Sequence, residues 1–108
     1  MDTKLIEYII AIAEEKSLSK AAERLYISQP ALSQRLKKLE DELGTPLFAR
    51  ERDGLTLTDA GRIYVNGGYS ILQIKRNALK KIASLSQSSK NTLRFACASS
   101  SAMEIIPA

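Results

Sequence analysis

The sequence predicts a mainly α-helical fold of three short helices, a two-stranded hairpin and one long final helix. Apolar residues recur every three or four positions up to Gly44 and again after Thr58, which is the spacing of one helix face. Between these segments the helical period is lost, and an Asp-Gly pair at 53–54 marks a tight turn. The last apolar pattern continues to about Leu85, so the final helix is expected to be the longest.

The first two helices are predicted from their capping residues and their apolar faces. Asp2 or Thr3 can cap the first helix, and Ser17 or Ser19 can cap the second. Small residues at Ala21-Ala22 allow another helix to cross the second one closely. The apolar face of the first helix consists of Leu5, Ile6, Ile9, Ile10 and Ala13.

The third helix has clear signals at both ends. Ser28 is suited to cap its first turn, where Pro30 costs no hydrogen bond. Gly44 suits the left-handed residue that ends a helix, and Pro46 prevents the helix from resuming. One stripe is expected to face the core: Leu32, Leu36, Leu39 and Leu43.

The opposite side of the third helix is polar, and its amino-terminal half carries no acidic residue. Pro30, Gln34, Lys37 and Asp41 lie on this side, with Ser33 and Lys38 beside them. Two short helices joined by Tyr26-Ile27-Ser28 form a helix-turn-helix, and such a second helix enters the major groove of DNA by its amino end. The alternative is a solvated amphipathic helix of any small helical domain.

The hairpin that follows is interpreted as a wing. Its strands are expected at 47–50 and 55–57, around a turn at 51–54. In this position Arg50 and Arg52 would meet the DNA backbone or the minor groove, whose negative potential attracts guanidinium groups. The alternative pairs these arginines with Glu51 or Asp53 as exposed ion pairs of little energetic weight.

Motifs at fixed spacing over nearly the whole chain resemble the DNA-binding domain of LysR-type bacterial transcriptional regulators. The motifs are Ser19-Lys20-Ala21-Ala22-Glu23-Arg24-Leu25, Ile27-Ser28-Gln29-Pro30-Ala31-Leu32-Ser33, Leu39-Glu40, Leu43-Gly44, Leu47-Phe48-x-Arg50 and Leu57-Thr58-x-Ala60-Gly61. The resemblance implies a winged helix-turn-helix, a long linker helix that dimerises, and binding to imperfect inverted repeats of double-stranded DNA.

The resemblance also implies roles for single residues. Positions matching Gln29, Pro30, Ser33 and Gln34 face the bases, and those matching Ser19, Lys20 and Arg50 hold phosphates. Together with the residues argued above, the expected DNA-binding set is Ser19, Lys20, Ser28, Gln29, Pro30, Ser33, Gln34, Lys37, Lys38, Arg50 and Arg52.

Two departures from the family pattern affect this site. Family members often read Ser-Arg-Gln where this chain has Ser33-Gln34-Arg35, so the arginine is displaced by one residue, about 100° around the helix. Gln34 would favour adenine, whereas arginine would favour guanine. The family wing commonly carries a basic residue at the position of Asp53, a role that Arg52 can take here.

The final helix carries an apolar stripe that needs a partner, and the same helix of a second subunit would supply one. The expected homodimer surface is Tyr64, Gly68, Ile71, Leu72, Ala78, Leu79 and Ile82. The Gly67-Gly68 pair interrupts good helix formers. It either permits a close helix approach or a bend, or it is a weak point near a loop.

These segments suggest a division into a DNA-binding domain at 1–57, a linker helix at 58–86, and a third part at 87–108. The third part has a hinge-like composition at 84–92 and an expected strand, loop and helix start at 93–106. It is similar to the opening of the family's effector-binding domain. Because the sequence stops at Ala108, we expect no functional inducer site in it.

The composition favours a DNA-binding protein over an enzyme. The net charge of +4 and the pI of about 9.3 suit a polyanionic partner. The chain has no histidine and no glycine-rich phosphate loop, so we expect no catalytic residue, metal or cofactor. Cys97 is expected to be a small apolar strand residue. Without a membrane-length apolar run, a cytoplasmic location is expected.

Two other functions are compatible with the same motifs. One is a truncated regulator subunit that captures full-length partners through its long helix instead of binding DNA. The other is the targeting domain of a DNA-processing protein, although no nuclease or recombinase residues are visible.

Overall fold

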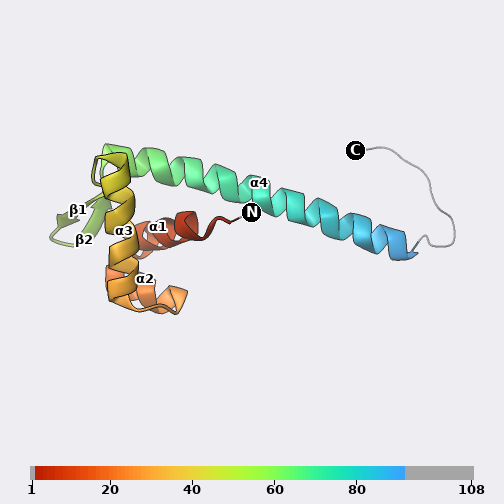
Figure 1. Ribbon diagram of the computed structural model, residues 1–108, viewed down its shortest axis with the longest axis horizontal. Helices are drawn as coiled ribbons and strands as arrows, with labels where there is room; N and C mark the ends of the chain where they lie inside the picture. The colour runs from red at the N-terminus through yellow and green to blue at the C-terminus, as the bar shows by residue number, and fades with distance from the viewer. Residues whose placement is uncertain (1, 92–108) are drawn as a thin grey trace. The chain divides into compact units, whose positions relative to one another are not determined.

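The computed structural model describes residues 2–91 and has the predicted mainly α-helical order. The segment expected at 93–106 and Cys97 lie outside the described residues. The elements, which Figure 1 shows, are α1 (Lys4–Glu15), α2 (Leu18–Leu25), α3 (Gln29–Leu43), β1 (Phe48–Glu51), β2 (Gly54–Leu57) and α4 (Asp59–Asn91).

Three of the helices begin at a side chain that accepts a backbone hydrogen bond. The hydroxyl oxygen of Ser17 accepts from the N–H of Lys20 at 3.1 Å, so Ser17 and not Ser19 caps α2. Ser28 caps α3 at 3.2 Å from the N–H of Ala31, and Thr58 caps α4 at 3.0 Å from the N–H of Gly61. Each bond satisfies a donor that has no partner inside its helix, which fixes where the helix begins.

Both candidate caps take part at the start of α1. The Asp2 carboxylate accepts a hydrogen bond from the N–H of Lys4 at 3.1 Å. Thr3 occupies the cap position, but its hydroxyl donates to the Glu7 carboxylate at 2.8 Å. The start of α1 therefore lies where the sequence predicts it.

The core lies between α1, α2 and α3, with contributions from the hairpin and the first turns of α4. Its largest fully buried side chains are Ile9, Ile12, Leu32 and Leu47. The leucine stripe of α3 is buried only in part, because Leu43 at its carboxyl end is 48% exposed. The core therefore ends about one helical turn before α3 does.

The hairpin is an antiparallel pair in which Phe48 lies opposite Leu57 and Arg50 opposite Leu55. The carbonyl oxygen of Lys16, just after α1, accepts a hydrogen bond from the N–H of Leu55 at 3.0 Å. A Cβ on Gly54 would lie 2.6 Å from the same oxygen. Glycine therefore lets the hairpin approach α1 closely, and this contact holds the wing in place.

The helix α4 is longer than the sequence predicts. It continues to Asn91, past the expected end near Leu85 and through most of the segment interpreted as a hinge. That segment contains serine, glutamine and lysine but neither glycine nor proline, so nothing in it forbids helical backbone.

The chain divides into two compact units after Gln73. The first contains α1 to β2 and the beginning of α4, and the described part of the second is the remainder of α4. Among residues 2–91, no helix is long and apolar enough to cross a membrane.

Candidate nucleic-acid interface

The amino end of α3 is open to solvent. Gln29, Pro30 and Gln34 are exposed, Ser33 is half-buried, and the exposed Ser28 caps the helix. The helix leaves several N–H groups of its first turn without intrahelical partners, and its macrodipole makes this end electropositive. An exposed helix end of this kind can approach a polyanion without displacing any packed side chain.

The candidate cations form no ion pair with the described residues. Arg24 pairs with Glu14 and Glu15, and Arg62 pairs with Asp59, but neither arginine belongs to the expected DNA-binding set. The alternative pairing of Arg50 or Arg52 with Glu51 or Asp53 is not observed. All five candidate cations are exposed and could reach phosphates: Lys20, Lys37, Lys38, Arg50 and Arg52.

The hairpin places its two arginines differently. Arg50 lies within β1 opposite Leu55, so its backbone is fixed by the strand pairing. Arg52 lies beside Asp53 in the turn between the strands. Ser19 and Lys20 are exposed in the first turn of α2, whose amino end is also electropositive.

Arg35 contacts another residue of its own chain. Its guanidinium carbon lies 5.4 Å from the centre of the Tyr8 ring on α1, within the range of a cation–π interaction. The arginine that is displaced by one position relative to the family pattern is thus directed at α1. Gln34 remains exposed in its place on the polar side of α3.

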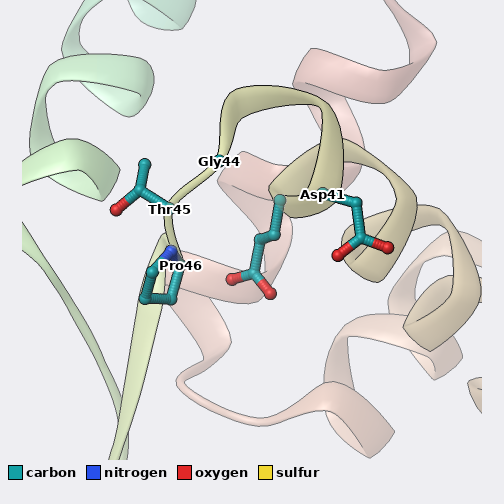
Figure 2. Close-up of a pocket in the computed structure, with 5 residues that line it drawn as sticks. Asp41, Gly44, Thr45 and Pro46 are labelled. Atoms are coloured by element: carbon teal, nitrogen blue, oxygen red, sulfur yellow. The ribbon is translucent and has the colours of Figure 1, made fainter.

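The carboxyl end of α3 is acidic, unlike its amino end. The Glu40 carboxylate accepts a hydrogen bond from the N–H of Leu47 at 2.7 Å and so holds the loop that leads into the hairpin. No pattern in the sequence indicates this role, because Glu40 stands in a run of three acids that solvation alone would explain. Figure 2 shows a shallow hollow here, lined by Glu40, Asp41, Gly44, Thr45 and Pro46.

This hollow does not belong to a phosphate-binding surface, because its ionisable side chains are carboxylates. Within residues 2–91, no group of three or more histidine, cysteine, aspartate or glutamate side chains is arranged to hold a metal ion.

A network of polar side chains that the sequence did not reveal joins α1, α2 and α4 in the first unit. Arg24 contacts Glu14 at 2.8 Å and Glu15 at 3.2 Å, and the Tyr69 hydroxyl donates to Glu14 at 2.5 Å. The hydrogen bond from Tyr69, followed by that from Arg24, lowers the pKa of Glu14. The same bond to Glu14 raises the pKa of Tyr69. Arg24, a polar-face residue of α2 that could have reached phosphates, is thereby paired within the chain.

Three residues of the expected dimer surface lie against the core of their own chain. Gly68 is buried inside its own subunit, where an added Cβ would lie 2.8 Å from a methyl group of Ile6. Tyr64 and Leu72 are half-buried against the same core, and this burial raises the pKa of Tyr64. A close helix approach was one of the alternatives for this glycine pair, and at Gly68 such an approach is made to α1 of the same chain.

The other expected dimer residues remain accessible. Ile71, Leu79 and Ile82 are 47%, 51% and 60% exposed, and Ala78 is half-buried. A Cβ added to Gly67 would meet no atom within 4 Å, so this glycine lies on an open face.

Beyond Gln73, two further large apolar residues of α4 are exposed although they are absent from the expected set. Ile74 is 67% exposed and Leu85 is 71% exposed. The apolar pattern already ends at Leu85, and its spacing could also have found Ile74, which lies three positions after Ile71 and four before Ala78.

The segment that contains the helix-turn-helix and the hairpin matches a known protein family. Residues 3–62 match the family described as "Bacterial regulatory helix-turn-helix protein, lysR family", and they include α1, α2, α3 and both strands of the hairpin.

Curated proteins with similar sequences are named as HTH-type transcriptional regulators. The chain is 38% identical over 102 residues to the HTH-type transcriptional regulator BudR of Klebsiella aerogenes, covering 94% of this chain and 71% of BudR. It is 44% identical over 87 residues to the uncharacterized HTH-type transcriptional regulator YcgK of Bacillus subtilis, covering 81% of this chain and 27% of YcgK. The chain thus spans most of the first relative and about a quarter of the second.

Solved structures are similar as well. One is a CbnR_DBD–DNA complex, which has a TM-score of 0.70 and 30% identity and covers 80% of this chain and 99% of that one. Another is a complex of BenM_DBD with catB site 1 DNA, which has a TM-score of 0.73 and 29% identity and covers 80% of this chain and 97% of that one.

Proposed function

Because the chain belongs to the LysR family of bacterial helix-turn-helix regulators, we propose that it binds specific double-stranded DNA sequences and regulates transcription. The observation that carries this proposal is the open amino end of α3, together with five exposed cations on α2, α3 and the hairpin that form no ion pair within residues 2–91. A solvated helix of an unrelated domain would not require this positive charge beside an acid-free helix end.

The contacts divide into two classes. Gln29, Pro30, Ser33 and Gln34 reach base edges, because they lie on the first two turns of the helix that enters the major groove. Gln34 presents one donor and one acceptor to adenine. The remaining residues position the protein on phosphates and sugars: Ser19, Lys20, Ser28, Lys37, Lys38, Arg50 and Arg52.

The protein acts as a homodimer through α4. A helix with exposed Ile74, Ile82 and Leu85 presents apolar area to water unless a second helix covers it. Ile74, Ala78, Ile82 and Leu85 are separated by four, four and three residues, which places them along one side of the helix. The revised surface therefore keeps Ile71, Ala78, Leu79 and Ile82, adds Ile74 and Leu85, and omits Tyr64, Gly68 and Leu72.

Dimerisation also matches the expected target. Two subunits on an imperfect inverted repeat raise affinity through effective concentration, because the second half-site binds within one complex. As a regulator of bacterial promoters, the protein would work in the cytoplasm, and we assign it neither a catalytic reaction nor a cofactor.

The test is selection of bound duplexes from a random pool, followed by a salt series on the selected sequence. The expected result is a pair of inverted half-sites and an affinity that falls linearly in log units with log salt, by about 0.9 per phosphate contacted. Failure to enrich any sequence, combined with tight capture of a full-length regulator, would favour the heterodimer alternative.

A further inference from the structure

Tyr26 is an exposed aromatic residue at the turn between α2 and α3. It is 94% exposed, and its backbone is left-handed with φ of 59°. The backbone N–H donates to the carbonyl oxygen of Glu23 at 3.2 Å and thereby closes α2. The helix end needs this left-handed backbone, but it does not need a tyrosine.

A tyrosine at position 26 does not favour the folded state. Glycine or asparagine is the usual residue at such a helix end, since a Cβ crowds the backbone in the left-handed region. An aromatic ring exposed to water gains nothing from burial either. Both considerations would favour a smaller residue at position 26.

The other three of the four tyrosines are all engaged within the chain. Tyr8 lies under Arg35, Tyr64 is half-buried against the core, and Tyr69 donates to Glu14. The Tyr26 ring, by contrast, packs against no core residue within 2–91 and is directed to solvent.

Its position relates it to the proposed interface. Tyr26 precedes the cap Ser28 by two residues and Gln29 by three. Since successive Cα atoms are about 3.8 Å apart, Tyr26 lies within about 11 Å of Gln29. The major groove is only about 12 Å wide, so a long side chain this close to a helix end inside the groove reaches the groove wall.

We propose that Tyr26 contacts the DNA backbone at the edge of the groove, with its hydroxyl donating to a phosphate oxygen and its ring packing on the adjoining sugar. This inference rests on the proposed DNA-binding function. Tyrosine is among the side chains that make such contacts. A neutral donor releases no counterion, so the contact adds affinity equally at all salt concentrations and for all sequences.

The experiment compares the full chain carrying Tyr26→Gly or Tyr26→Phe with the unsubstituted protein on selected and random duplexes over a salt series. We expect Tyr26→Gly to lose roughly five- to twentyfold in affinity on both duplexes, with an unchanged salt slope, and Tyr26→Phe to lose roughly threefold. Thermal unfolding of Tyr26→Gly should occur at the same or a higher temperature, which excludes misfolding as the cause.

Leu43→Ala is the matched control, because Leu43 is a partly exposed apolar residue at the other end of α3, about 21 Å along the helix from Gln29. It should bind DNA as the unsubstituted protein does. Full affinity in Tyr26→Gly would overturn the inference while leaving the proposed function intact, and full affinity in Tyr26→Phe would overturn the hydroxyl contact. If the unsubstituted protein bound no duplex, that result would contradict the proposed DNA-binding function itself, and with it this inference.

Discussion

A Cβ placed on Gly61 would lie 2.0 Å from the carbonyl oxygen of Leu47, a separation that no side chain can adopt. The same oxygen accepts a hydrogen bond from the N–H of Thr58 at 3.0 Å. The first turn of α4 is thus pressed against the backbone that leads into the hairpin. Glycine at position 61 is what allows the wing and α4 to share this contact.

Gly61→Ala should destabilise the protein by about 2 kcal/mol or more, because the obstacle is a fixed backbone atom and not a flexible side chain. Gly67→Ala is the control, since nothing lies within 4 Å of that position and alanine is the better helix former. It should stabilise the protein by about 0.5–1 kcal/mol. Urea unfolding measures both, and equal effects of the two substitutions would contradict the close contact at Gly61.

A second prediction separates base reading from backbone contact. Gln34→Ala should lose preference at one base pair in each half-site, at about 1–3 kcal/mol, while its affinity for random duplex stays unchanged. Arg50→Ala should weaken binding to all sequences alike and reduce the salt slope by about 1 per subunit. Binding titrations on selected, mutated and random duplexes measure this. Similar profiles for both variants would mean that the two classes of contact are assigned wrongly.

The third prediction concerns the bond between Tyr69 and Glu14. Because the folded-state pKa of Glu14 is lowered, its contribution to stability is present above its unfolded value of 4.5 and is lost as the pH falls through the folded value. Because the pKa of Tyr69 is raised, its contribution is present below 10.0 and is lost as the pH rises through its folded value. The bond should therefore stabilise the protein across the neutral range.

Tyr69→Phe should raise the pKa of Glu14 towards 4.5, as followed by NMR titration of its carboxyl carbon. Both side chains are substantially exposed, so the loss of stability at pH 7 should be only about 0.5 kcal/mol and smaller at high salt. Tyr64→Phe serves as the control, because the pKa of Tyr64 is raised by burial and not by Glu14. An unchanged titration of Glu14 in Tyr69→Phe would show that the hydrogen bond does not form in solution.

Much of the fold could be predicted from the sequence because the signals are local. Ser28 and Gly44 mark the ends of α3 by hydrogen bonding and backbone conformation within a few residues. The residues of the candidate interface could be placed for the same reason, since helical spacing alone puts Gln34 and Lys37 on the side away from the buried leucines. The backbone φ of 126° at Gly54, directly after the turn, is a further local reason for glycine there.

The parts that could not be predicted depend on contacts between distant residues. Periodicity shows that one side of α4 is apolar, but it does not show that α1 covers Gly68 while Ile82 stays exposed. The direction of Arg35 depends on Tyr8 in another helix, and that of Tyr69 on a residue 55 positions away. The expected end of α4 near Leu85 was wrong for a different reason, because a polar composition without any helix-breaking residue was interpreted as a hinge.

The last prediction tests dimerisation on the revised surface. Ile82→Glu places a charge on an apolar residue that is 60% exposed in the subunit, so the fold itself should be little affected. If a second α4 covers this residue, each subunit loses about 1.5–3 kcal/mol of apolar burial and must also desolvate a carboxylate. The dissociation constant of the dimer should therefore rise by at least about a hundredfold, as measured by sedimentation equilibrium.

Ser84→Glu is the matched control, because it introduces the same charge on an exposed residue about 200° around the helix from Ile82. It should leave self-association unchanged. Operator affinity should follow the oligomeric state, since a monomeric Ile82→Glu protein loses the effective concentration of its second half-site but keeps its affinity for a single one. Dimers of undiminished stability in Ile82→Glu would show that α4 is not covered at this position.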